Sequence, residues 1–242
     1  MTAAKRALVT GANKGIGREV ARRLAMEGFS VWLGARDADR GTRAAADLRA
    51  EGLDVQWVEM DVSKDESVAA AARILSQQCS HLDVLVNNAG IAINYDRPPS
   101  EQRIADIKAT YEVNVFGAIR VTQAFLPLLL AAPAARIVMV SSYSASLGRA
   151  VDRTSPSYSV NMLGYGSSKA ALNAVTVSFA KELAPRGVLV NAAAPGYTAT
   201  DLNAHRGQRT VQQAAGIVKR LAMLGADGPT GGYFDDDGTV PW

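Results

Sequence analysis

The sequence predicts an α/β fold in which one parallel β-sheet lies between two layers of helices. Short apolar runs alternate with stretches of helical periodicity along the whole of the 242 residues. The run Ile137–Val140 is entirely apolar, as in a parallel strand that is buried on both faces. Several expected strands end in glycine, asparagine or serine, which brings polar groups to one edge of the sheet. Together these features predict a single doubly wound domain over residues 1–242.

The composition limits the classes of partner and the cellular compartment that are expected for this protein. Hydrophobic residues make up 48% of the chain, enough for a continuous core, and a net charge of +3 predicts no nucleic-acid partner. Cys79 is the only cysteine, so no internal disulfide forms and a reducing compartment is expected. Met1–Arg6 lacks the apolar run of a secretory signal, and the most apolar segment, Ala124–Ala135, is too short for a membrane span. We expect a cytoplasmic protein with neither a membrane partner nor a bound metal.

The first expected strand, Ala7–Val9, runs into a glycine-rich turn that opens a helix. Glycines let the backbone approach a pyrophosphate closely, while the start of a helix offers unpaired N–H groups and a positive dipole end. The residues of this turn that we expect to bind a dinucleotide are Gly11, Asn13, Lys14, Gly15, Ile16 and Gly17. The alternative is a tight turn that needs positive φ angles at two of the glycines.

The second expected strand, Ser30–Ala35, ends where a Rossmann-type fold meets the adenosine ribose. An acidic residue there would bind a free 2′-hydroxyl, but the strand ends in alanine. Arg36 and Lys14 provide two cations that suit a 2′-phosphate, so the sequence favours NADP(H) over NAD(H). The alternative is that both cations are solvated, and Asp37 is able to pair with Arg36 or Arg40.

The next expected elements lead to further ligand-side residues. They are a helix over Ala38–Ala50, a strand over Val55–Met60, a helix over Ser63–Cys79 and a strand over Leu82–Val86. Asp61 and Val62 follow the third strand, where Asp61 either accepts from an adenine amino group or caps the next helix. The turn Asn87–Gly90 follows the fourth strand and is either a loop anchor or an ordinary Asn-Gly turn. Its expected cofactor residues are Asn88, Ala89 and Gly90.

The middle of the chain supplies a long helix and a central strand. The helix is expected over Ile104–Leu130 and carries Asn114 among apolar neighbours, where an amide needs a polar partner or a function. The strand Arg136–Ser141 follows and ends beside Ser142. An insert over Tyr143–Gly164 then precedes the next helix.

Tyr165 and Lys169 are one helical turn apart, so both side chains are expected to point into the same site. A free tyrosine has a pKa of about 10. A neighbouring cation favours the phenolate and lowers that pKa, which suits a group that exchanges a proton with a carbonyl or alcohol oxygen. The alternative is a surface tyrosine and lysine on an amphipathic helix.

The remaining elements complete the alternation. The helix is expected to run to Leu183, followed by a strand over Gly187–Asn191, a helical segment within about 197–224 and a strand over Gly232–Phe234. Pro195, Gly196 and Thr198 lie just after the sixth strand, on the ligand side of the sheet.

The ordered set of these motifs resembles the short-chain dehydrogenase/reductase family over essentially the whole chain. The resemblance implies that Tyr165 is the general acid in reduction, and that Lys169 lowers its pKa and holds the nicotinamide ribose. It implies that Ser142 polarises the substrate carbonyl, and that Asn114 distorts its helix and orders a water in a proton relay. Asn88 and Asp61 match adenosine-side positions, and Thr198 matches a position that contacts the nicotinamide carboxamide.

The sequence is most similar to the NADPH-dependent carbonyl reductase branch. The resemblance rests on the first glycine turn, on Ala35–Asp37 and on the segment from Gly228 to Trp242. A longer insert after the serine is associated with monomers in that branch; here it is intermediate, so monomer and homo-oligomer both remain open. The expected substrate wall is apolar and aromatic and favours a bulky, uncharged ketone or aldehyde. It comprises Ile93, Tyr95, Tyr143, Leu147, Val151, Tyr158 and Met162.

The leading hypothesis is an NADP(H)-dependent reductase of ketones or aldehydes that is reversible in principle. One alternative keeps the chemistry as a dedicated biosynthetic ketoreductase or a secondary-alcohol dehydrogenase. A second alternative is a non-catalytic dinucleotide-binding sensor, against which the intact set of Ser142, Tyr165 and Lys169 argues.

Overall fold

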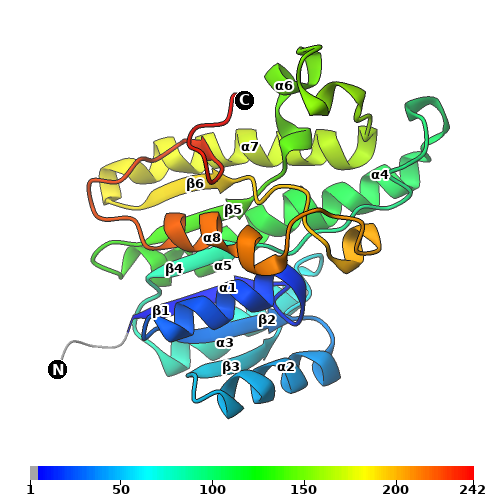
Figure 1. Ribbon diagram of the computed structural model, residues 1–242. Coiled ribbons are helices and arrows are strands. Elements are labelled where there is room, and N and C mark those ends of the chain that lie inside the picture. Colours follow the sequence, from blue (N-terminus) through cyan, green and yellow to red (C-terminus); the bar gives the residue numbers. More distant parts are fainter. Residues whose placement is uncertain (1–4) are drawn as a thin grey trace.

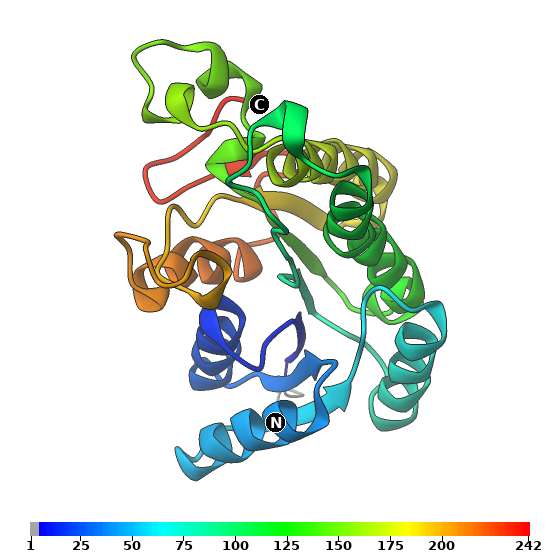
Figure 2. The ribbon, with the colours of Figure 1, turned by 90° about the vertical axis from the view of Figure 1, so that its right-hand side faces the viewer.

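The computed structural model describes residues 5–242, in which seven parallel strands form one sheet between two helical layers (Figures 1 and 2). The strand order is β3-β2-β1-β4-β5-β6-β7. The order reverses its direction between β1 and β4, which is where open α/β sheets bind ligands. The predicted fold class, a doubly wound Rossmann-type sheet, is confirmed.

The strands align so that their carboxyl ends meet at one edge of the sheet. Their bounds are β1 Arg6–Thr10, β2 Ser30–Ala35, β3 Val55–Glu59, β4 Val84–Asn87, β5 Arg136–Val140, β6 Leu189–Ala193 and β7 Tyr233–Phe234. Thr10 lies opposite Gly34, and Val140 lies opposite Ala193. The loops that follow these strands therefore open onto a common site.

The helices cover both faces of the sheet (Figure 2). Their bounds are α1 Gly15–Met26, α2 Ala38–Ala50, α3 Asp65–Gln78, α4 Ile104–Tyr111, α5 Ala118–Leu130, α6 Leu147–Val151, α7 Leu163–Leu183 and α8 Val211–Ala222. One layer contains α1, α2 and α8, and the other contains α3, α5 and α7. The expected helix before Leu183 begins two residues earlier than Tyr165, so the insert ends at Met162.

A π-helical segment, Glu112–Gly117, joins α4 to α5 and interrupts the predicted long helix. Asn114 lies within this segment and is buried. A β-carbon on Gly117 would lie 2.9 Å from a methyl carbon of Val62, so glycine allows the wide turn to approach the loop after β3. The local helix distortion expected at Asn114 is therefore present.

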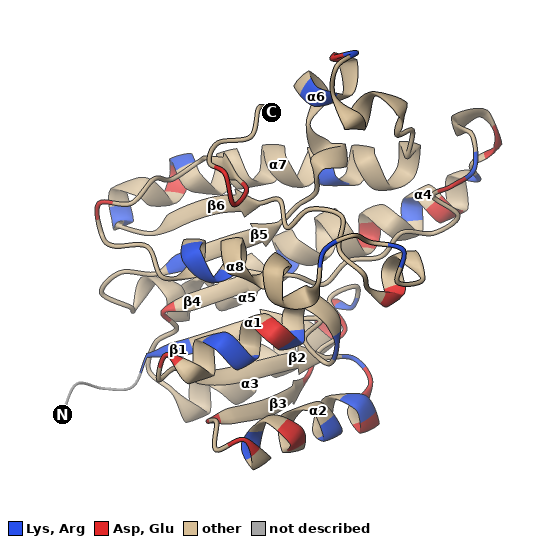
Figure 3. Ribbon diagram, viewed as in Figure 1, with Lys and Arg blue, Asp and Glu red and all other residues tan. Residues whose placement is uncertain are grey.

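The run Ile104–Leu130 is, by length and composition, long and apolar enough to span a membrane, unlike the shorter segment weighed above. In the structure part of this run packs in the core, while Ile104 and Phe116 are exposed. Val121, Phe125 and Leu129 are fully buried together with residues of the sheet and of α3 and α7. On the face seen in Figure 3, acidic and basic residues are interspersed over the helices.

The core position of α5 gives a stability prediction. Phe125 is 0% exposed, so Phe125→Ala should lower the free energy of unfolding by about 3 to 5 kcal/mol, through lost burial and the cavity left behind. Phe116 is 50% exposed, so Phe116→Ala is the matched control and should change the free energy of unfolding by only about 0.5 kcal/mol. Urea denaturation of both variants measures the difference. Similar losses in the two variants would contradict the packing described for α5.

Candidate active site

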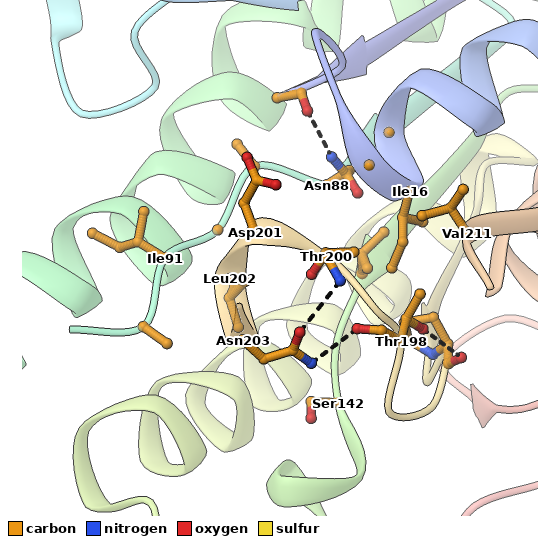
Figure 4. Close-up of a pocket in the computed structure, with 18 of the residues that line it drawn as sticks. Ile16, Asn88, Ile91, Ser142, Thr198, Thr200, Asp201, Leu202, Asn203 and Val211 are labelled. Carbon is orange, nitrogen blue, oxygen red and sulfur yellow. Dashed lines mark hydrogen bonds between the residues drawn. The ribbon is translucent and has the colours of Figure 1, made fainter. Parts of the chain in front are cut away.

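A cleft of about 1380 Å³ lies at the carboxyl edge of the sheet. The loops after β1, β2, β3, β4, β5 and β6 line it, together with the insert after Ser142 and the segment before α8. Figure 4 labels residues from the loops after β1, β4, β5 and β6. Every residue predicted to contact cofactor lines this one cleft, as do Ser142, Tyr165 and Lys169. Asn114 lies behind the wall rather than on it.

The glycine-rich turn is tied to the end of β4. Asn88 Nδ2 donates to the carbonyl oxygens of Thr10 at 2.8 Å and Gly11 at 3.2 Å. The Thr10 hydroxyl in turn accepts from the backbone N–H groups of Asn88 and Ala89, both at 3.0 Å. This network makes Asn88 a loop anchor, and it gives Thr10 a role that the sequence analysis did not assign.

The turn requires its glycines. Gly11 and Gly15 have φ angles of 61° and 59°, in the left-handed region that side chains disfavour. A β-carbon on Gly17 would lie only 2.4 Å from Asn88 Nδ2, and one on Gly11 would lie 2.8 Å from the Ala89 Cα. The start of α1 therefore reaches the cleft as exposed backbone, which suits a phosphate group.

Lys169 is buried beneath the cleft. Its ammonium lies 5.8 Å from the ring centroid of Tyr165 and donates to the carbonyl oxygen of Val140 at 2.8 Å. The side chain is 3% exposed, and burial lowers the pKa of Lys169 to about 8. The tyrosine and the lysine share one site, as their spacing predicts.

The environment of Tyr165 differs from expectation in its effect on acidity. Burial raises the pKa of Tyr165 above its usual value, and the hydroxyl of Ser142 counteracts this only in part. From the spacing of the two residues, Lys169 was expected to lower the pKa of Tyr165. In this structure the loss of solvation on burial outweighs the opposing hydrogen bond from Ser142, so the net shift of the Tyr165 pKa is upward.

Ser142 is held from two sides at the end of β5. Its hydroxyl accepts a hydrogen bond from the Ser144 hydroxyl at 2.9 Å. The hydroxyl of Tyr233 donates to the backbone carbonyl of Ser142, and the Tyr233 ring stacks on Trp242 with centroids 5.4 Å apart. Residues far along the chain therefore support the expected carbonyl-binding serine.

Asn114 uses its whole amide group to hold neighbouring segments. Its Oδ1 accepts from the Ile91 N–H, and its Nδ2 donates to the Ile91 carbonyl, both at 2.9 Å. The same Nδ2 lies 3.0 Å from the Ser168 hydroxyl. The side chain links the π-helical segment to the loop after β4 and to α7, which accounts for a polar residue in this apolar stretch.

The residues expected beside the adenosine have different environments. Arg36 is exposed and makes no hydrogen bond or ion pair within residues 5–242, because Asp37 caps α2 and pairs with Arg40. Lys14 instead pairs with Asp201, at 2.5 Å. Asp61 accepts from the N–H and hydroxyl of Ser63. Burial opposes ionisation of Asp61, but these hydrogen bonds leave its pKa lowered.

The segment after β6 folds over the glycine turn (Figure 4). The Thr198 hydroxyl donates to the carbonyl of Gly196 at 3.1 Å, and Asn203 Nδ2 donates to the carbonyl of Thr198 at 2.9 Å. Thr200 and Asn203 form a capping box on a short 3₁₀ turn. The ion pair between Asp201 and Lys14 then closes this segment onto the first loop. This ion pair was not predicted from the sequence, since its partners are 187 residues apart.

The predicted substrate wall is only partly correct. Tyr95, Tyr143 and Met162 line the cleft. Ile93, Leu147, Val151 and Tyr158 do not; the last three are exposed instead. The wall also contains residues that the sequence analysis overlooked, namely Ile91, Ser144, Arg149, Val160, Tyr197 and Leu202. Polar and cationic groups thus stand beside the apolar ones.

The sheet, the glycine turn and the serine–tyrosine–lysine wall together are features of nucleotide-dependent oxidoreductases. The family model for short chain dehydrogenases matches residues 5–210, so the chain belongs to that family of oxidoreductases. Among curated relatives, carbonyl reductase [NADPH] 1 of Rattus norvegicus is 32% identical over 98% of both chains.

Two further comparisons agree with this assignment. The 3-oxoacyl-[acyl-carrier-protein] reductase of Aquifex aeolicus is 35% identical over 83% of this chain and 76% of its own length. The crystal structure of NADPH-bound carbonyl reductase from chicken fatty liver has a TM-score of 0.86 and 28% identity, and the match covers 99% of both chains.

The buried lysine gives a pH prediction. The folded protein binds the Lys169 proton less tightly than the unfolded chain, where a lysine titrates near about 10.4. The free energy of unfolding of the wild type, relative to Lys169→Met, should therefore be constant below about pH 8 and increase from there towards about pH 10.4. Denaturant titrations of both proteins across this range measure the difference. A difference independent of pH would show that Lys169 has the pKa of a solvated lysine.

Proposed function

We propose that the protein is an NADP(H)-dependent reductase that transfers a hydride to the carbonyl carbon of a ketone or aldehyde, reversibly in principle. The observation that carries the proposal is the position of Ser142, Tyr165 and Lys169 on one wall of a cleft that also contains the glycine turn. A proton donor, a carbonyl-binding hydroxyl and a dinucleotide site would then meet in one place.

The residues present fit a dinucleotide. A β-carbon at Gly11 or Gly17 would collide with the loop after β4, which leaves bare backbone at the start of α1 for a pyrophosphate. A β-carbon on Gly90 would lie 3.3 Å from the Lys169 ammonium, so glycine keeps the space beside that ammonium open. Bound NADPH supplies the hydride, and that chemistry belongs to the cofactor.

Residues of the chain itself carry out the proton transfer. Ser142 donates a hydrogen bond to the substrate oxygen and polarises the carbonyl. Tyr165 donates its proton to the same oxygen as the alcohol forms, and its raised pKa keeps the phenol protonated at neutral pH. The ammonium of Lys169 stabilises the phenolate left behind and holds the nicotinamide ribose. Asn114 shapes this region by fixing Ile91, and the water relay expected from it remains a proposal.

The preference for NADP(H) rests on charge. The end of β2 carries no acidic side chain, and Arg36 has its guanidinium exposed at the cleft. Lys14 contributes a second cation, although Asp201 competes for it. The NADPH named for the carbonyl reductase relatives supports the same choice.

A dedicated biosynthetic ketoreductase is the second candidate, because a relative named as a 3-oxoacyl reductase is similar over most of the chain. A screen of ketones, aldehydes and acyl thioesters with NADPH distinguishes the two by substrate range. If no compound causes NADPH consumption, the remaining hypothesis is a non-catalytic nucleotide sensor. We propose a small-molecule substrate, with neither nucleic acid nor membrane as a partner.

Removal of the proton donor gives the first prediction for this function. Tyr165→Phe should lower kcat by about 10²-fold or more, because the positioned acid is lost, while the Kd for NADPH stays within a few-fold of the wild type. Steady-state kinetics and fluorescence titration measure the two quantities. Near-normal turnover would show that another group donates the proton.

The second prediction concerns the nucleotide. Arg36→Asp places an acid where a 2′-phosphate is proposed, so KM for NADPH should increase at least about tenfold more than KM for NADH. The matched control is Arg40→Asp, since Arg40 does not line the cleft and pairs with Asp37. Equal increases for the two nucleotides in Arg36→Asp would remove Arg36 from the phosphate site.

A further inference from the structure

Arg149 is a cation on the substrate side of the cleft that no expectation from the sequence included. It lies in α6, within the insert after Ser142, and its side chain lines the same cleft as Ser142 and Tyr165. Its guanidinium carbon lies 4.4 Å from the ring centroid of Tyr143. Its Nε is buried without a hydrogen-bond partner, and its guanidinium forms no ion pair within residues 5–242.

The position of Arg149 is fixed by its surroundings. The Ser146 hydroxyl caps α6 by accepting from the Arg149 N–H at 3.1 Å, and it donates to the Pro241 carbonyl at 2.6 Å. The N–H of Gly148 donates to the carbonyl of Trp242 at 2.9 Å. The short helix is thus anchored to the segment beyond β7, and the guanidinium of Arg149 lies over the Tyr143 ring.

The other charges beside Tyr143 already have partners. Asp235 accepts the Tyr143 hydroxyl at 2.9 Å and the N–H groups of Asp237 and Gly238. Burial and Asp235 raise the pKa of Tyr143 to about 12, against smaller opposing effects of Arg149 and Arg209. The guanidinium of Arg209 also has a buried, unbonded Nε, but it pairs with Asp236.

Two more charged groups complete the surroundings of Arg149. Arg220 donates to the carbonyl oxygens of Asp235 and Asp236. Asp152 follows α6 and accepts from the N–H and hydroxyl of Thr154. These hydrogen bonds and, less strongly, the charge of Arg149 lower the pKa of Asp152, although the two side chains form no ion pair. Within residues 5–242 the guanidinium of Arg149 therefore has neither a hydrogen-bond acceptor nor an ion-paired carboxylate, although Asp152 lies near enough to feel its charge.

A guanidinium stacked on an aromatic ring keeps its N–H edge free for a planar anion, which it binds through two parallel hydrogen bonds. A partly buried cation that lacks such a partner loses solvation without compensation, so an anion that enters the cleft gains more there than at the surface. Arg149, Ser142 and Tyr165 line the same cleft, so one molecule with its carbonyl at Ser142 and Tyr165 is able to carry an anion to Arg149.

We propose that the substrate is a keto acid, whose carboxylate binds Arg149 while its carbonyl is reduced between Ser142 and Tyr165. This inference rests on the proposed reductase function and replaces the expected uncharged substrate with an anionic one. Tyr143 acts as a positioning residue, because its ring supports the guanidinium and Asp235 holds its hydroxyl.

Matched substrates test the proposal. Levulinate, its two next longer homologues and the methyl esters of all three are compared with NADPH at low ionic strength. For at least one chain length, kcat/KM for the keto acid should exceed that for its ester by about tenfold or more, as expected for one charge-assisted bidentate contact. The preference should appear in KM and decline in high salt. Equal or higher kcat/KM for every ester would overturn the proposal.

Variants assign the preference to Arg149. Arg149→Met should lower the ratio of keto-acid to ester kcat/KM by at least about tenfold, and Arg149→Lys should retain part of it. Arg153→Met is the matched control, because Arg153 belongs to the same insert and is exposed outside the cleft; it should leave the ratio unchanged. An equal fall for acid and ester in Arg149→Met would make Arg149 a support for Tyr143 only and overturn its role in binding.

Failure of the reductase function is distinguishable from failure of the carboxylate site. If neither acids nor esters are reduced, the proposed function is wrong. The Kd values of each keto acid and its ester for the protein–NADPH complex then test the carboxylate site without any turnover. Tighter binding of an acid than of its ester, lost in Arg149→Met, would support the anion site. Equal binding of acid and ester would overturn it.

Discussion

The ammonium of Lys169, buried and bonded to the carbonyl of Val140, is the interaction on which the rest of the site depends. Because this ammonium loses nearly all its water, every segment around it is constrained in size or polarity. Gly90 approaches it without a side chain, and Asn114 ties the π-helical segment to Ile91 and to α7. The loops after β4 and β5 and the start of α7 thus meet around one charge, and Tyr165 receives its place from the same arrangement.

The sequence was sufficient for the fold and for the residues that line the glycine-turn side of the cleft. The bounds of β2 and α2 were predicted to the residue, because clear apolar periodicity and the turn residues at their ends determine them. The glycine turn was located because positive φ angles and close backbone approach leave few residue choices. Strand ends elsewhere were displaced by one or two residues, since hydrogen bonding to neighbouring strands decides them rather than local sequence.

Other properties depend on contacts between distant segments and could not be read from local pattern. The pKa of Tyr165 is set by burial, which the spacing of tyrosine and lysine does not reveal. Lys14 looked like a free cation, yet Asp201 pairs with it across the mouth of the cleft. The insert has little apolar periodicity, so its exposed Leu147 and Val151 were mistaken for a substrate wall while Arg149 was overlooked. In each case tertiary contacts outweighed the local signal.

The support of Ser142 by Tyr233 has a consequence for how the protein is made. The hydrogen bond joins residues 91 positions apart, and the contact of Ser146 with Pro241 joins residues 95 apart. A nascent chain that has emerged from the ribosome only as far as α8 therefore holds the glycine turn and Tyr165 but lacks the strand that supports the serine. Contacts so distant in sequence form late and slowly. The serine at the end of β5 therefore gains its support only when β7 and Trp242 are present.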